Sequence, residues 1–196
     1  MRERERMRDA ELAVRLKETG KEFFSLPDLE KVTGLKKGSL YVALSRLSER
    51  GILRRAARGI YVLPDANPLP EKVASQLYFP CYLSFESALS RAGVLGLVPY
   101  VLSFATPRKT RRLYVLEQVI EYRKIKEDLF FGFELAEGYY LARPEKAFLD
   151  SLYLAACGKG SLPESELDLS LLDRDLLREY AERFPAAVRK RLEALL

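Results

Sequence analysis

The chain has 196 residues and a formal net charge of +5, and its 48% hydrophobic and 11% aromatic content predicts one or two compact domains. Histidine is absent, which excludes Ser/His and Cys/His catalysis, and the two cysteines, Cys81 and Cys157, cannot supply a zinc-ligand set. We expect both thiols to be reduced and buried, and we expect no catalytic site, no metal and no cofactor.

The basic charge is concentrated at the start of the chain. Residues 1–70 contain 15 Lys and Arg against 10 Asp and Glu, whereas residues 71–196 contain 18 basic and 18 acidic side chains. Three prolines between 64 and 70 interrupt any helix or strand, so we expect two domains, 1–66 and 71–196. Short, charge-broken apolar runs and a charged N-terminus predict a cytoplasmic protein without a membrane partner.

The first domain begins with two short helices joined by an extended piece. Leucines four apart predict a helix over 11–20, and residues 23–24 read as extended. A second helix over 25–34 starts with Ser25 and Asp28, which have the spacing of a capping box. A glycine ends each helix, which is typical of a C-cap.

A third helix, beginning near Gly38, has an apolar stripe on one side only. Leu40, Ala43, Leu44 and Leu47 form that stripe at 100° per residue, and the opposite side is left free. Residues 52–63 then predict two strands around a turn at 57–59. This order of elements is typical of a winged helix-turn-helix, whose third helix enters a major groove.

The free side of the third helix and the basic wing are the candidate DNA contacts. We expect phosphate contacts from Lys36, Lys37, Arg54, Arg55 and Arg58. We expect base contacts from Ser39, Tyr41, Val42, Ser45 and Arg46, with Val42 placed for a thymine methyl and Arg46 for guanine. Winged helices also serve as protein-binding modules, but the confinement of the excess charge to this domain favours double-stranded DNA.

The second domain reads as α+β. Two short helices precede strand-like runs between 99 and 142 that predict a mostly antiparallel sheet. The segment 143–156 is apolar nearly all round, so we expect a buried helix, and two amphipathic helices divided by Pro185 finish the chain. Seventeen of the 21 aromatic residues follow residue 70, and we expect them in the core rather than on a stacking surface.

One loop of the second domain carries four cations, Arg108, Lys109, Arg111 and Arg112, and we expect it at a hairpin tip. It is either a second phosphate contact or a solvated loop. The GKGS run at 158–161 lacks the preceding strand and spacing of a phosphate-binding loop.

The residues also allow a nuclease, in addition to a DNA-binding regulator. Its candidate carboxylates are Glu121, Glu134, Glu145 and Asp150. These residues lack the spacing of metal-dependent nucleases, and helix-start and i,i+4 ion-pair chemistry with Lys146 explains Glu145 and Asp150. We therefore expect no enzyme.

Four segments in a fixed order carry a family resemblance. They are KGSLYVALSRLSERGILRRAARGIYVLP, YLSFESALSRAGVL, VLSFATPRKTRR and GYYLARPEKAFLDSLYL. With them the chain resembles the antitoxins of AbiE-type (type IV) toxin–antitoxin systems, which act in abortive infection. The resemblance implies a repressor that binds inverted repeats in its own promoter, as a homodimer or as paired monomers. It also implies activity against a nucleotidyltransferase-like toxin without a stable complex. The alternative is a winged-helix regulator whose second domain binds a small effector.

Overall fold

A computed structural model describes the backbone of residues 2–196 and the side chains from residue 9 onward. The chain divides into two compact units, Met1–Val73 with Val115–Glu117, and Ala74–Tyr114 with Gln118–Leu196. The predicted domain limits, 1–66 and 71–196, stay a prediction.

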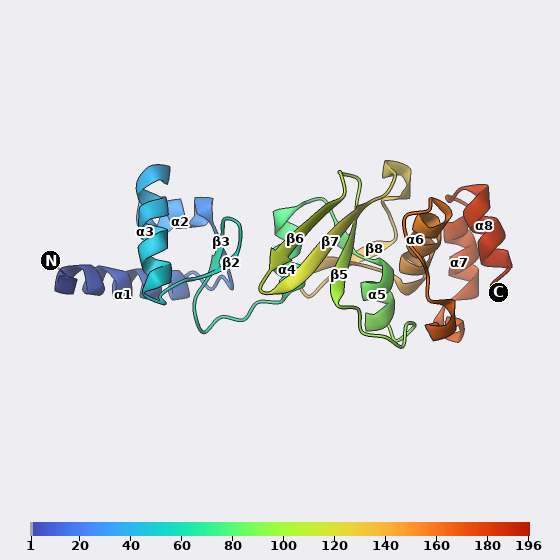
Figure 1. The fold of residues 1–196 in the computed structure, drawn as a ribbon, viewed down its shortest axis with the longest axis horizontal. Helices are drawn as coiled ribbons and strands as arrows, with labels where there is room; N and C mark the ends of the chain where they lie inside the picture. The colour runs from blue at the N-terminus through green and yellow to red at the C-terminus, as the bar shows by residue number, and fades with distance from the viewer. Residues whose placement is uncertain (1) are drawn as a thin grey trace. The chain divides into compact units, whose positions relative to one another are not determined.

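The first unit has the element order of a winged helix-turn-helix (Figure 1). Its elements are α1 (Arg2–Glu18), β1 (Phe24–Ser25), α2 (Leu26–Thr33), α3 (Lys37–Glu49), β2 (Arg54–Ala57) and β3 (Ile60–Val62). The three strands form one antiparallel sheet in the order β1-β3-β2. The predicted helices, the extended piece and the wing are confirmed, but the first helix begins at Arg2 instead of residue 11.

Helix α2 is bounded by the cap residues that the sequence predicts. The Ser25 side chain accepts a hydrogen bond from the Asp28 backbone N–H, and the Asp28 carboxylate accepts one from the Ser25 N–H at 2.9 Å. Gly34 ends the helix in the left-handed region, with φ 68°. Partial burial raises the pKa of Asp28, but the hydrogen bonds that its carboxylate accepts from Lys21 and Ser25 lower the pKa by more than burial raises it. The net pKa therefore lies below 3.8.

The second unit carries one six-stranded sheet and most of the remaining helices. From residue 70 onward the helices are α4 (Pro70–Leu77), α5 (Phe85–Arg91), α6 (Pro144–Ala156), α7 (Arg174–Ala181) and α8 (Ala186–Glu193). Three 3₁₀ turns lie at η1 (Glu127–Leu129), η2 (Glu164–Glu166) and η3 (Leu169–Leu171). The strands are β4 (Tyr82–Leu83), β5 (Val101–Thr106), β6 (Arg111–Val115), β7 (Gln118–Lys124), β8 (Phe133–Ala136) and β9 (Tyr139–Ala142).

The sheet has the strand order β6-β7-β5-β4-β9-β8. Antiparallel pairs join β4 to β5 and β8 to β9, whereas β5 pairs with β7 and β4 pairs with β9 in parallel. The α+β class is confirmed, and antiparallel pairs predominate over the two sheets together. The expected hairpin tip at 107–110 is wrong, because β5 pairs with β7, so β7 lies between the two strands that this loop joins.

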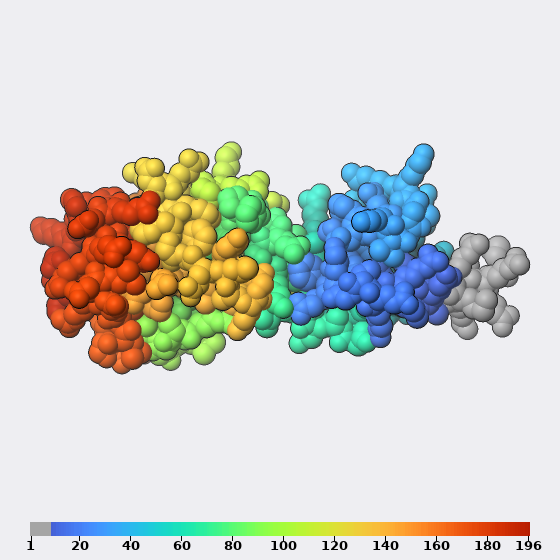
Figure 2. All heavy atoms as spheres, turned by 180° about the vertical axis from the view of Figure 1, so that it is seen from behind, coloured from blue at the N-terminus to red at the C-terminus, as the bar shows by residue number. Residues whose placement is uncertain are grey.

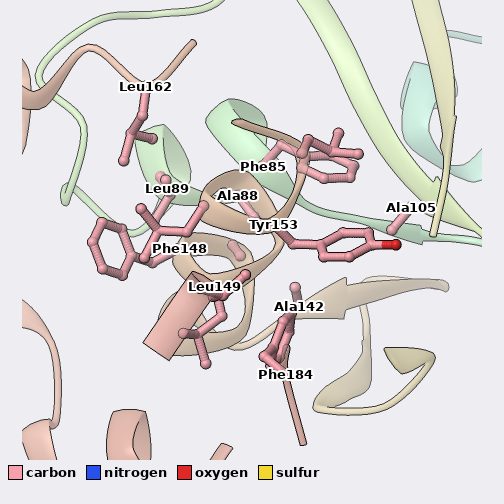
Figure 3. Packing of buried hydrophobic residues seen from close by; sticks show 14 of the residues in the cluster. Phe85, Ala88, Leu89, Ala105, Ala142, Phe148, Leu149, Tyr153, Leu162 and Phe184 are labelled. Carbon is pink, nitrogen blue, oxygen red and sulfur yellow. The ribbon is translucent and has the colours of Figure 1, made fainter. Parts of the chain in front are cut away.

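Helix α6 forms the centre of the second core, as predicted. Every side chain from Glu145 to Leu154 is buried, and the helix contacts α5, α7 and α8. Figure 3 shows side chains of α5 and α6 meeting around Phe148 and Leu149, with Phe184 beside them. Burial of this continuous apolar surface is the main term that stabilises the unit.

The aromatic residues of the second unit lie mainly in its core. Tyr82, Phe85, Phe104, Tyr122 and Phe148 are completely buried, whereas Tyr100 and Tyr114 are among the exposed exceptions. The core interpretation is therefore confirmed for most of them.

The two cysteines are free, as expected, but only Cys81 is buried. Burial raises the pKa of its thiol to about 12. Cys157 is exposed, and the prediction that it is buried is wrong because this residue caps the C-terminal end of α6, where the chain leaves the core. No helix within residues 2–196 has the length and apolar character needed to cross a membrane.

Candidate nucleic-acid interface

Helix α3 is anchored by one side and open on the other. Leu40, Leu44 and Leu47 are each about 1% exposed and pack with Leu16 and Leu29 of the first two helices. Replacing such a buried leucine with alanine costs about 2–5 kcal/mol, so this row of leucines fixes the direction in which the outer side faces. Figure 2 shows residues of α2 and α3, in light blue, at the surface of the first unit.

The predicted base contacts on α3 lie on this outer side. Ser39 and Ser45 are exposed, and so are Tyr41 and Val42, whose exposed fractions of 47% and 74% are high for large apolar side chains. The Ser45 hydroxyl donates a hydrogen bond to Glu49 at 3.1 Å. A hydroxyl, a phenol and an isopropyl group are thus presented side by side, which suits hydrogen bonding and methyl contact at base edges.

Arg46 differs from the other predicted base contacts because it forms an ion pair with a buried carboxylate of another helix. Its Nη2 donates to Asp9 of α1 at 3.4 Å, and the Nη1 of Arg50 donates to the second oxygen of the same carboxylate. The Asp9 side chain is only 4% exposed, while the two arginines are partly exposed. This ion cluster joins α1 to α3 and gives α3 a second, polar attachment.

The sequence analysis missed Asp9. It lies 37 residues before Arg46 and 41 residues before Arg50, in a segment rich in alternating charges. The only available signal is that α1 and α3 belong to one small helical domain, and this does not select one carboxylate among several.

The wing carries its three arginines at the surface. The guanidinium of Arg54 donates to the Ala66 carbonyl at 3.4 Å, and Arg55 donates to the Ala57 carbonyl at 3.3 Å, so both are held near the backbone. Arg58 stands at the turn, where Gly59 adopts φ 78°. Arg58, Lys36 and Lys37 are exposed and make no ion pair with any side chain from residue 9 onward. These cations are available to phosphate oxygens.

The four cations at 108–112 are only partly free. The Arg108 guanidinium stacks over the Tyr78 ring at 4.3 Å and donates to the Phe79 carbonyl at 2.9 Å, and Arg111 lies 5.5 Å from the same ring. Lys109 and Arg112 are exposed, and their side chains make no such contact with the side chains described from residue 9 onward. This loop thus offers two free cations and two that are oriented by an aromatic ring.

A buried polar cluster in the second unit was not foreseen. Lys146 and Asp150 form an ion pair in which both side chains are 0% exposed. Asp150 also accepts hydrogen bonds from the Tyr82 and Ser84 hydroxyls, each at 2.8 Å. The Lys146 ammonium group lies 5.1–5.3 Å from the ring centres of Tyr82, Phe131 and Phe184. The expected i,i+4 ion pair is confirmed, and the fold encloses it completely in the core of the second unit.

Burial controls the electrostatics of this cluster. It raises the pKa of Asp150 and lowers the pKa of Lys146, and each charge partly opposes the shift of the other. The pKa of Tyr82 is raised well above 10 by burial and by the Asp150 charge. Ser84 is the N-cap residue of α5, but its hydroxyl donates to Asp150 and makes no capping hydrogen bond to that helix. The cluster is sealed by side chains and suits a structural role.

The carboxylates weighed for a nuclease each have a partner in the fold. Glu121 accepts from Arg123 at 2.8 Å, Glu134 pairs with Arg143 at 3.5 Å, and the Glu145 carboxylate accepts from the Asp173 N–H at 3.0 Å. Glu145 lies in the first turn of α6, as expected, and its carboxylate also binds the backbone of the segment at Asp173. From residue 9 onward, no three His, Cys, Asp or Glu side chains are grouped so that they could hold a metal ion.

Comparison with known proteins agrees with the winged-helix geometry. Residues 11–64 match the family model described as "Transcriptional regulator, AbiEi antitoxin". The crystal structure of the Rv2827c protein from Mycobacterium tuberculosis is similar in fold, with a TM-score of 0.65 and 16% identity, over 94% of this chain and 76% of that chain. No curated protein matches. The resemblance to an AbiE-type antitoxin and regulator is thus confirmed for the N-terminal segment, and that family is not an enzyme class.

Proposed function

We propose, from the match of residues 11–64 to AbiEi-type transcriptional regulators, that the chain is a DNA-binding autorepressor and antitoxin that binds inverted repeats in its own promoter. The observation that carries this proposal is the outer side of α3, which is exposed while its inner side is anchored in the core, together with the three surface arginines of the wing that follows this helix. A surface of this kind fits a major groove and its flanking phosphates.

The contacts divide into two classes with different expected effects. The wing arginines and Lys36 and Lys37 neutralise phosphates and position the protein without reading sequence. Tyr41, Val42 and Ser45 read base edges. Arg46 reads a guanine only when its ion pair with Asp9 opens, so we assign it the weakest share of the base readout.

Salt dependence of binding to the gene's own upstream region tests the phosphate class. With about four to six phosphates neutralised, the log–log slope of affinity against salt is about −4 to −5. The change Arg54→Ala/Arg55→Ala/Arg58→Ala lowers affinity for all duplexes and reduces the slope by about 3. A matched triple change, Arg174→Ala/Arg178→Ala/Arg189→Ala, removes the same charge from exposed sites on α7 and α8 and leaves the slope unchanged. A wild-type slope near zero contradicts DNA binding.

Sequence preference tests the base class. Substituting alanine for Tyr41, Val42 or Ser45 reduces discrimination between the operator and scrambled DNA by about 1–3 kcal/mol per lost base contact. The salt slope stays constant in these variants because no phosphate contact is lost. Unchanged discrimination in all three variants means that α3 does not read the groove.

The antitoxin half of the proposal assigns neutralisation of a nucleotidyltransferase-like toxin to the second unit, without a stable complex. The full-length wing variant provides the test in cells that express the toxin encoded beside this gene. That variant loses repression and still protects the cells, because the second unit is unaltered. Loss of protection together with repression places the antitoxin activity on the DNA-binding surface instead.

A further inference from the structure

A hollow of about 390 Å³ opens in the second unit beside strand β7. Its walls come from β7, from the start of α5 and from residues 159–161, which follow the C-terminal end of α6. The hollow lies outside the proposed DNA contacts, and it includes Lys159, Gly160 and Ser161 of the GKGS run. Its volume is in the range of small-molecule sites.

Arg123 forms the fixed floor of this hollow. Its Nη1 donates to both oxygens of Glu86 at 2.9 and 3.0 Å, and its Nε donates to Glu121 at 2.8 Å. The guanidinium also lies 5.1 Å from the ring centre of Phe85. Burial lowers the pKa of Arg123, but the two carboxylates raise it more, so the group stays charged. Its Nη2 makes no hydrogen bond to the side chains or backbone that the structure describes, which leaves donors for a ligand.

Two lysines that line the hollow, Lys124 and Lys159, add uncompensated charge. Lys124 and Lys159 are exposed, and neither ammonium group pairs with a carboxylate in the described part of the chain. Their backbones are held in place: the Lys124 N–H donates to the Thr110 hydroxyl oxygen at 3.2 Å, and the Lys159 N–H donates to the Leu154 carbonyl at 2.9 Å. The hydroxyls of Thr110 and Ser161 line the same space.

We propose that this hollow binds the phosphate group of a small molecule, held by Lys124, Lys159 and the free edge of Arg123. Both carboxylates are turned to Arg123, so the donors that remain are cationic or hydroxyl groups, and the three cations exceed the two carboxylates by one charge. Charge-assisted hydrogen bonds of this kind are the strong contacts of phosphate sites. The GKGS run follows a helix instead of starting one, so the side chains, and no helix dipole, hold the phosphate.

Proton–nitrogen NMR titration of the full chain tests the site, with inorganic phosphate, AMP and a short single-stranded oligonucleotide as separate probes. Phosphate or AMP shifts the resonances of β7 and residues 159–161 in a saturable way. Lys124→Ala/Lys159→Ala weakens this binding by roughly tenfold per lysine or more, the factor expected for a charged hydrogen bond. Lys126→Ala/Lys190→Ala removes the same charge from exposed positions outside the hollow and leaves affinity unchanged.

The probes separate the sources of the phosphate. Tighter binding of AMP than of inorganic phosphate supports a phosphorylated metabolite, and equal binding supports free phosphate. Three results overturn the proposal: no saturable shift with either small probe, equal weakening in both double variants, or binding of the oligonucleotide alone. The DNA-binding proposal is unaffected by any of these, because its test variants lie in the first unit or on α7 and α8.

Discussion

Breaking the buried pair Lys146–Asp150 from one side is expected to be far more damaging than removing both charges together. Both side chains are 0% exposed, so a remaining partner keeps an uncompensated charge in the core. Removing one partner of such a pair costs about 3–5 kcal/mol, whereas apolar replacement of both is often close to neutral.

The structure ranks the two single changes. In Lys146→Met, Asp150 keeps the hydroxyl donors of Tyr82 and Ser84, so we expect a loss of about 3 kcal/mol. In Asp150→Leu, the ammonium keeps one hydrogen bond, to Tyr82, and three aromatic rings, so the loss is about 4–5 kcal/mol. The double change leaves the two hydroxyls without their acceptor, at a cost of about 1–3 kcal/mol.

Urea unfolding followed by circular dichroism measures these losses, with the free energy of unfolding extrapolated to zero denaturant. The double-mutant cycle is expected to give a coupling of about 4 kcal/mol or more from the three losses above. Lys124→Met, on an exposed lysine of the same unit, serves as the control and changes stability by less than about 0.5 kcal/mol. Additive single losses would refute the reasoning, since they mean that neither charge depends on the other.

Three further changes probe other parts of the fold. Asp9→Asn removes the charge that attaches α1 to α3 and lowers the free energy of unfolding by about 1–2 kcal/mol, because the arginines regain water. Glu11→Gln, at an exposed ion pair, lowers it by less than about 0.5 kcal/mol, and equal losses in the two variants contradict a special role for Asp9. The pKa of Asp28 is lowered in the folded protein, so its contribution to stability is complete above about pH 3.8 and is lost as the pH falls through the folded-state pKa. NMR titration measures that pKa, and Asp28→Asn abolishes this acid dependence. A measured pKa above 3.8 contradicts the capping box. Gly132→Ala lowers the free energy of unfolding in urea by about 2–4 kcal/mol, because φ is +71° and the added Cβ would lie 3.0 Å from the Lys146 Cγ. Gly158→Ala, with φ +68° and open space around it, costs only about 1 kcal/mol. Similar losses at both sites argue against the close approach at Gly132.

Local rules were sufficient to predict the helices and the wing of the first unit. The cap at Ser25, the glycine at position 34 and the leucine spacing of α3 act over a few residues, so their outcome is readable from the chain alone. The exposure of the α3 outer side follows from the same periodicity, which is why the candidate base contacts could be named before any fold was known. The burial of α6 was also readable, because an apolar surface on all sides has no other stable place.

Contacts between segments far apart in sequence decided the ion cluster at Asp9, the pairing of the second sheet and the enclosure of the buried Lys146–Asp150 pair. Asp9 and Arg46 meet only because α1 crosses α3, and the parallel pairing of β5 with β7 depends on which strands the whole sheet brings together. The four-residue spacing of Lys146 and Asp150 is in the sequence, but their enclosure by rings from other segments is not. Spacing along the chain determines which groups share a helix face. The dielectric environment of a buried group and its partner across the core depend on segments far away in sequence, so they are set only once the chain has folded.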